Sequence, residues 1–77
     1  MTRVSTADVQ PRAQAALEES PILELRVLRV QDRERSLLLC GRVSSFYHKQ
    51  LAQEVVRAVC RECTEADIEL VNSIRVE

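Results

Sequence analysis

The most regular pattern of apolar and polar positions runs from Phe46 to about Cys60 and has helical periodicity. At about 100° per residue, six apolar side chains share one arc, with Val56 at its edge: Tyr47, Leu51, Ala52, Val55, Ala58 and Val59. The opposite side is polar and holds Gln50, Gln53, Glu54, Arg57 and Arg61. Ser44 or Ser45 precedes the pattern and can cap a helix. We therefore predict an amphipathic helix over 45–61.

Three other segments alternate between apolar and polar residues, as half-buried strands do. The segment 22–30 directs Leu23, Leu25 and Val27 to one side, and the last segment spans 68–76. The middle segment, 36–43, has four residues on its inward face: Leu37, Leu39, Gly41 and Val43. The connector QDRER between the first two strands contains no glycine. A tight two-residue hairpin is therefore not expected, and we predict a longer loop.

A shorter helix is predicted over 10–20, because Pro11 suits a first helical turn and Ser20 precedes a proline, where helices end. The polar residues 1–9 are expected to be flexible. The element order is then α-β-β-α-β. A strand–helix–strand succession favours parallel pairing with a right-handed crossover, whereas the first two strands should be antiparallel. We predict a single α+β domain, a three-stranded mixed sheet with two helices packed on one face.

Composition limits what the chain can be. Its 77 residues include 45% apolar and 30% charged residues, as expected of a globular protein. No apolar run reaches the roughly 20 residues that span a bilayer, and the first ten residues contain no apolar segment of a signal peptide. We therefore expect a cytoplasmic protein that can still lie peripherally on a membrane. The net charge of −1 gives no bulk attraction for nucleic acid, which is not an expected partner.

The cysteines offer the most specific candidate chemistry. Cys60 and Cys63 have C-x-x-C spacing, and Cys40 and His48 could nominally complete a zinc site. However, His48 and Cys60 lie about 18 Å apart along one predicted helix. A redox pair is favoured at a helix N-terminus, where the dipole stabilises a thiolate, and this pair lies at the C-terminal end. We expect structural thiols and no metal or other cofactor.

No nucleophile, base or carboxylate pair lies in a recognisable catalytic motif, so enzyme activity is not expected. The only glycine, Gly41, lies on the inward face of the second predicted strand. We interpret it as a structural position, where a missing side chain lets the following helix start close to the strand. A phosphate-binding loop would need further glycines at set spacings.

The run LLLCGRVSSFYHKQLAQEVVRAV, followed by LVNSIRV, resembles the BON domain, a bacterial module of envelope, osmotic-stress and channel-associated proteins. The resemblance covers about residues 22–77. Gly41 and Val43 match the Gly-x-Val that ends a strand of the family, and Ser44 and Ser45 match its small-residue turn. The matching positions in the helix and last strand are Lys49, Ala52, Val55, Val56, Val71, Asn72, Ile74 and Val76. The resemblance implies a non-catalytic module that binds phospholipid membranes or other proteins.

The candidate binding surface is the sheet face that points away from the helices. Alternation places arginines among aliphatic side chains there, with Cys40 and Ser73 between them; the candidate binding residues are Arg26, Leu28, Leu38, Arg42, Val71 and Arg75. Structural roles are assigned to Gly41, Ser44, Ser45 and Asn72.

Three interpretations of that face stay open. It can be an ordinary half-solvated sheet face on which arginine stems cover apolar carbon. Its arginines can instead bind anionic lipid headgroups at about 1 kcal/mol each, so that three alone bind weakly and need avidity or an apolar insertion. Alternatively, Leu28, Leu38 and Val71 form a protein interface, such as that of a homodimer, without lipid binding.

Overall fold

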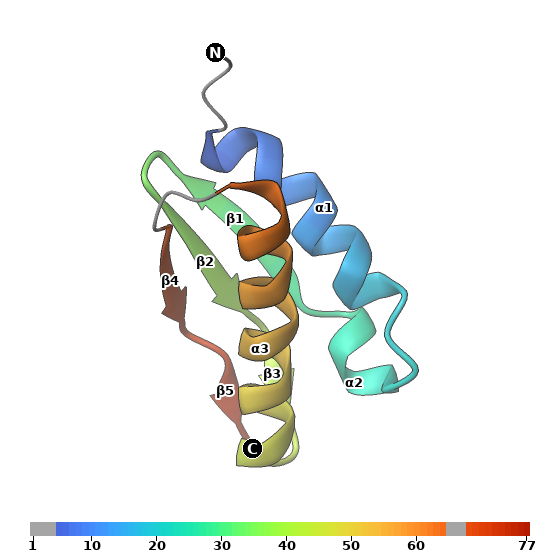
Figure 1. Ribbon diagram of the computed structural model, residues 1–77. Helices are drawn as coiled ribbons and strands as arrows, with labels where there is room; N and C mark the ends of the chain where they lie inside the picture. The colour runs from blue at the N-terminus through green and yellow to red at the C-terminus, as the bar shows by residue number, and fades with distance from the viewer. Residues whose placement is uncertain (1–4, 65–67) are drawn as a thin grey trace.

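The computed structural model describes residues 5–64 and 68–77 of the chain. The elements in order are α1 (Thr6–Glu18), α2 (Leu23–Arg26), β1 (Arg29–Arg33), β2 (Ser36–Cys40), β3 (Arg42–Val43), α3 (Phe46–Cys63), β4 (Glu69–Asn72) and β5 (Arg75–Val76). Strands β1, β2 and β4 form one sheet in the order β1-β2-β4, with α1 and α3 packed on one face (Figure 1). The predicted fold class is therefore confirmed: the protein is α+β, with a three-stranded mixed sheet and two helices.

The strand pairing follows the predicted orientations. β1 and β2 are antiparallel, with Val30 opposite Leu39, and β2 and β4 are parallel, with Leu38 beside Val71. The short strands β3 and β5 form a second, parallel pair. Each of the last two predicted strands is thus divided into two pieces, although the N–H groups of Ser73, Arg75 and Glu77 continue to donate to the carbonyls of Leu39, Gly41 and Val43 across the break.

The core is aliphatic, as the composition predicts, and lies between the helices and the inward face of the sheet. Its members are Val9, Ala13, Leu17, Leu25, Leu28, Val30, Leu37, Leu39, Val43, Ala52, Val56, Cys60 and Ile74. Contributions come from every helix, from β1, β2 and β3, and from Ile74 between β4 and β5. The same cluster therefore joins both ends of the molecule.

The segment 22–30 is not the predicted strand. Residues 23–26 form the single turn of α2, and β1 begins only at Arg29. Leu25 and Leu28, three residues apart, enter the core, whereas Leu23 and Val27 are exposed. Spacing of three residues places side chains on one face of a helical turn. The period in this segment is therefore helical, and the predicted alternation of Leu23, Leu25 and Val27 is wrong.

The connection between β1 and β2 is also tighter than predicted, because only Glu34 and Arg35 lie between the paired strands. Glu34 has a φ of 61°, in the left-handed region that glycine usually occupies. The hydroxyl of Thr6, at the start of α1, lies within hydrogen-bond distance of the Asp32 carboxylate and the Glu34 carbonyl. A tight hairpin therefore forms without glycine, and α1 holds it from the side.

Helix α1 begins earlier than predicted, and Pro11 lies inside it rather than in its first turn. The start is fixed by Ser5, whose backbone N–H donates to the Asp8 carboxylate over 3.1 Å. The Ser5 hydroxyl donates to the same carboxylate, and the two hydrogen bonds lower the pKa of Asp8. Part of the predicted flexible segment is thus helical, and residues 1–4 lie outside the described residues.

Helix α3 spans the predicted segment, but its buried stripe is rotated from the predicted one. Ala52, Val56 and Cys60 are its buried residues, while Tyr47 and Ala58 are exposed. Ser45, one of the two predicted caps, accepts a hydrogen bond from the His48 backbone N–H over 3.2 Å. The rotation matters because it turns Tyr47, in the first turn of the helix, toward solvent.

Gly41 lies at the junction between β2 and β3, with a φ of +131° that other residues rarely adopt. A Cβ atom built there would lie 2.6 Å from the Cδ2 atom of Leu28. The close neighbour is thus the chain entering β1, whereas we predicted the start of the long helix. The structural role of Gly41 stands, with a different partner.

Candidate functional site

The structure brings four of the six candidate binding residues together in two pairs. Leu38 and Val71 are direct neighbours on β2 and β4, on the sheet face away from the helices. Arg42 and Arg75 are neighbours on β3 and β5, and both side chains are exposed. We call this face the outer face.

The other two candidates do not lie on the outer face. Leu28 is fully buried in the core, and Arg26 lies on α2, where its Nε donates to the Ser20 carbonyl over 2.6 Å. The error follows from the wrong period assigned to 22–30. Because Val30 points inward from β1, the outward positions of that strand are Arg29, Gln31 and Arg33.

The paired arginines share one carboxylate. Glu77 lies 3.4 Å from a guanidinium nitrogen of Arg42 and 3.4 Å from one of Arg75. Like charges directly opposite each other on neighbouring strands repel, and Glu77 offsets that repulsion only in part, since one acid faces two cations. These three residues leave a net positive charge where β3 and β5 meet.

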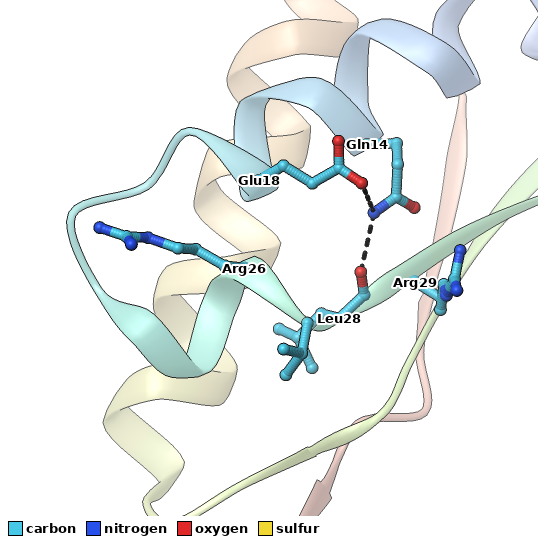
Figure 2. Close-up of a pocket in the computed structure, with 6 residues that line it drawn as sticks. Gln14, Glu18, Arg26, Leu28 and Arg29 are labelled. Carbon is cyan, nitrogen blue, oxygen red and sulfur yellow. Dashed lines mark hydrogen bonds between the residues drawn. The ribbon is translucent and has the colours of Figure 1, made fainter.

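A pocket of about 280 Å³ opens beside the outer edge of β1 and is lined by Gln14, Glu18, Arg26, Val27, Leu28 and Arg29. The Gln14 amide nitrogen in it is already bonded to the Glu18 carboxylate and the Leu28 carbonyl (Figure 2). The two arginines extend away from each other, as Figure 2 shows. They do not converge on a common ligand atom, so the pocket is not our candidate site.

A second surface carries most of the exposed apolar side chains. Of the large apolar residues that are exposed in the described part of the chain, all but Val71 lie on or directly after α2 or at the start of α3: Leu23, Val27, Phe46 and Tyr47, exposed by 70%, 73%, 75% and 67%. We call these four residues the apolar end. Figure 1 shows α2 beside the first turns of α3, at the lower end of the molecule.

Glu24 connects the two parts of the apolar end. Its carboxylate accepts hydrogen bonds from the backbone N–H and hydroxyl of Ser44, the latter over 2.8 Å, and contacts Nδ1 of His48. The rings of His48 and Tyr47 lie 5.9 Å apart. Hydrogen bonds from His48 and Ser44 hold the pKa of Glu24 below its usual range. A single carboxylate therefore fixes α2 against the start of α3.

The assigned structural residues act through hydrogen bonds. Ser44 binds Glu24 rather than capping the helix, and Ser45 is the cap. The Asn72 amide nitrogen donates to the Lys49 carbonyl and to the Gln53 side chain, and its oxygen accepts from the Ile74 backbone N–H. Asn72 thereby ties β4 to α3 and turns the chain between β4 and β5.

The cysteines occupy packing positions. Cys60 is buried, Cys40 and Cys63 are half-buried, and all three are free thiols. Burial raises the pKa of Cys60, which opposes thiolate chemistry. Among residues 5–64 and 68–77, no three His, Cys, Asp or Glu side chains gather as a metal ion would require.

Sequence reasoning missed the apolar end, although two signals for it exist. The spacing of Leu25 and Leu28 fits a helical turn, and Ser20-Pro21 can start a helix as well as end one. The side-chain oxygen of Ser20 accepts the Ile22 backbone N–H over 3.1 Å, directly before α2 begins at Leu23. Predicting a helical turn in this segment would also have predicted that Leu23 and Val27 are exposed.

Comparisons of the chain with protein-family models, curated proteins and solved structures gave no match. The resemblance to BON domains therefore stays a prediction from the sequence. No helix in the described part of the chain has the length and apolar character needed to cross a membrane.

Proposed function

We propose that the protein is a non-catalytic module that associates peripherally with anionic phospholipid membranes and enters the headgroup region with its apolar end. The observation that supports this proposal is the exposure of Leu23, Val27, Phe46 and Tyr47, which lie on or directly after α2 and at the start of α3, two elements that Glu24 holds together. Aromatic side chains with a polar tip or edge suit the membrane–water interface, where one end of the residue is apolar and the other wet.

Basic side chains near the apolar end favour an anionic surface. Arg26 lies on α2, Lys49 follows in the first turns of α3, and the Arg42–Arg75 pair lies on the strands at the same end of the molecule (Figure 1). Two acids of this region are already engaged, since Glu24 binds Ser44 and Glu77 lies between the two arginines. A phosphate group can compete with Glu77 for two adjacent guanidinium groups.

The magnitudes require both contributions. Arginines near an anionic surface contribute about 1 kcal/mol each, which gives weak binding for a few of them. Burying a large apolar side chain contributes about 1.5–3 kcal/mol when the transfer is complete. The apolar end thus supplies the insertion that arginines alone lack. The resemblance to BON domains, which implies phospholipid or protein binding, supports the same choice.

Vesicle co-sedimentation tests the proposal, with vesicles of phosphatidylcholine alone and of phosphatidylcholine mixed with phosphatidylserine. The native chain should sediment with the mixed vesicles and not with the neutral ones. The double variant Phe46→Ser/Tyr47→Ser should lose that binding, whereas Leu38→Ser, which removes an apolar side chain from the outer face, should retain it. Equal binding to both vesicle types, or full binding by the double variant, would contradict the proposal.

Charge variants separate the two contributions. Removing two arginines at about 1 kcal/mol each, as in Arg42→Gln/Arg75→Gln, should weaken binding to anionic vesicles by about thirtyfold. A control of equal net charge, Arg35→Gln/Arg61→Gln, changes the hairpin and the far part of α3 and should have a much smaller effect. Circular dichroism on each variant confirms that the fold is retained.

A further inference from the structure

The two lateral edges of the three-stranded sheet differ. On the β1 edge, Gln14 accepts a hydrogen bond from the Val30 backbone N–H over 2.8 Å and donates to the Leu28 carbonyl over 2.9 Å. Gln10 donates to the Val30 carbonyl over 2.7 Å. Two glutamines of α1 therefore satisfy both backbone groups of Val30 and the carbonyl of Leu28, and α1 lies against this edge.

The β4 edge lacks such cover. The backbone N–H groups of Ser73 and Arg75 donate to the carbonyls of Leu39 and Gly41. Because strand residues alternate in direction, the N–H and C=O groups of Leu70 and Asn72 point away from β2. In the described part of the chain, no hydrogen bond reaches these groups on that side. The strand also lacks the proline or lysine that usually blocks an exposed edge.

We infer that β4 pairs with the β4 strand of a second copy, antiparallel, about a twofold axis that passes beside Val71. In this register Leu70 lies opposite Asn72 of the partner subunit, and Asn72 lies opposite the partner's Leu70. Both pairs exchange N–H···O=C bonds, which uses the backbone groups that β2 leaves unpaired. The pairing ends at Ile74, whose N–H is already bonded to the Asn72 side chain.

Side chains on the outer face are complementary in the same register. Val71, 37% exposed, lies opposite the partner's Val71 and continues the apolar row that it forms with Leu38. Glu69 lies opposite the partner's Ser73, and the partner's Arg75 follows two residues beyond, past the end of the pairing, from where its long side chain can extend to contact Glu69. The twofold axis repeats this contact between opposite charges. Such self-complementarity favours a second copy over an unrelated peptide.

The dimer would have a six-stranded sheet with both outer faces on one side. An interface made of one four-residue strand and its flanking side chains is smaller than the roughly 1,200 Å² of standard stable complexes. We therefore expect a weak dimer, populated in the range from tens of micromolar to about 1 mM protein. This inference does not depend on membrane binding.

Sedimentation velocity from about 10 µM to 1 mM protein tests the inference in five samples. The native chain should shift toward dimer with concentration. Val71→Lys and Val71→Asp should each stay monomeric, because a residue at the twofold axis meets its own charge. An equimolar mixture of these two variants should form a heterodimer again. Leu38→Lys, a matched change one strand from the axis, should leave the dimer in place.

Three outcomes would overturn the inference. The native chain could stay monomeric at 1 mM, Val71→Lys could dimerise as well as the native chain, or the mixture of the two charge variants could stay monomeric. Circular dichroism on the variants confirms folding. Val71 is partly exposed and lies outside the buried core, so its replacement should leave the fold intact.

Discussion

The two ends of the molecule are held in the same manner and present opposite surfaces. At the hairpin end, the β1–β2 turn and the start of α1 meet through Thr6 and Asp32, and the turn exposes charged side chains. At the apolar end, Glu24 links α2 to Ser44 and His48, and the residues around it are large and apolar. Each end thus has one carboxylate that holds two elements together. Only one end leaves apolar surface uncovered.

The difference indicates that the apolar end is not a by-product of folding. Single exposed apolar residues are ordinary on protein surfaces, whereas a group of them marks a contact site. The hairpin end shows that the same chain can close a tight turn entirely with polar side chains. The rest of the described surface carries Val71 as its only other exposed large apolar residue. We attribute the contrast to function at α2 and the start of α3.

The largest expected effect comes from the residues that anchor α2. Leu28→Ala should lower the free energy of unfolding by about 2–5 kcal/mol, because it leaves a cavity in the core. Val27→Ala removes a side chain that is 73% exposed and should change stability by no more than about 0.5 kcal/mol. Urea denaturation of both variants measures the difference. A larger loss for Val27→Ala than for Leu28→Ala would restore the strand alternation predicted for 22–30.

Gly41→Ala should have the next largest effect, because Gly41 joins β2 to β3 and lies against Leu28. The added methyl group meets Leu28 and the backbone keeps a positive φ, so we expect a loss of about 2–3 kcal/mol of stability. The control Ser73→Ala alters the other chain break, between β4 and β5, at an exposed side chain. If both variants unfold at the same urea concentration, the close approach of Leu28 to Gly41 is not a constraint.

Much of the fold can be predicted from the sequence where one period dominates. The long helix, predicted over 45–61 and observed over 46–63, the two orientations of strand pairing and the aliphatic core follow from long patterns in the chain. The segment 22–30 could not be assigned in this way, because Leu23, Leu25, Val27 and Leu28 fit both a strand and a helical turn. Tertiary burial decides between them, since Leu25 and Leu28 fill the core together.

The candidate site depended on that same ambiguity. Leu38, Val71, Arg42 and Arg75 were placed correctly relative to one another, because strands of clear alternation carry them. The strand assignment misplaces Arg26 and Leu28 with their segment, and it directs Leu23 and Val27 to the same side as Leu25, which is buried, whereas both are exposed. The exposure of Tyr47 depends on the rotation of α3, which packing against α1 and the sheet determines. The apolar arc of this helix is wide, so its periodicity alone does not predict which part of the arc is buried.

The smallest expected effect is a pH dependence of the apolar end. The folded pKa of Glu24 is lowered by His48 and Ser44, so its stabilising contribution is present at neutral pH and decreases as pH falls through the acidic range below about 4.3. Glu24→Gln should remove that part of the acid destabilisation, while Glu62→Gln, at an exposed position of α3, should not. Thermal unfolding between about pH 3 and pH 7 measures the two slopes. If the stability of Glu24→Gln falls with pH as steeply as that of the native chain, Glu24 does not contribute to the attachment of α2.

Tryptophan fluorescence tests the central claim most directly, because the chain contains no tryptophan. Phe46→Trp places one reporter at the apolar end, and Leu38→Trp places one on the outer face of the sheet. With phosphatidylserine-containing vesicles, we expect the emission of the tryptophan at position 46 to shift to shorter wavelength and to be quenched by brominated lipids. The tryptophan at position 38 should show neither change. An unchanged spectrum at position 46, or a larger shift at position 38, would contradict insertion through the apolar end.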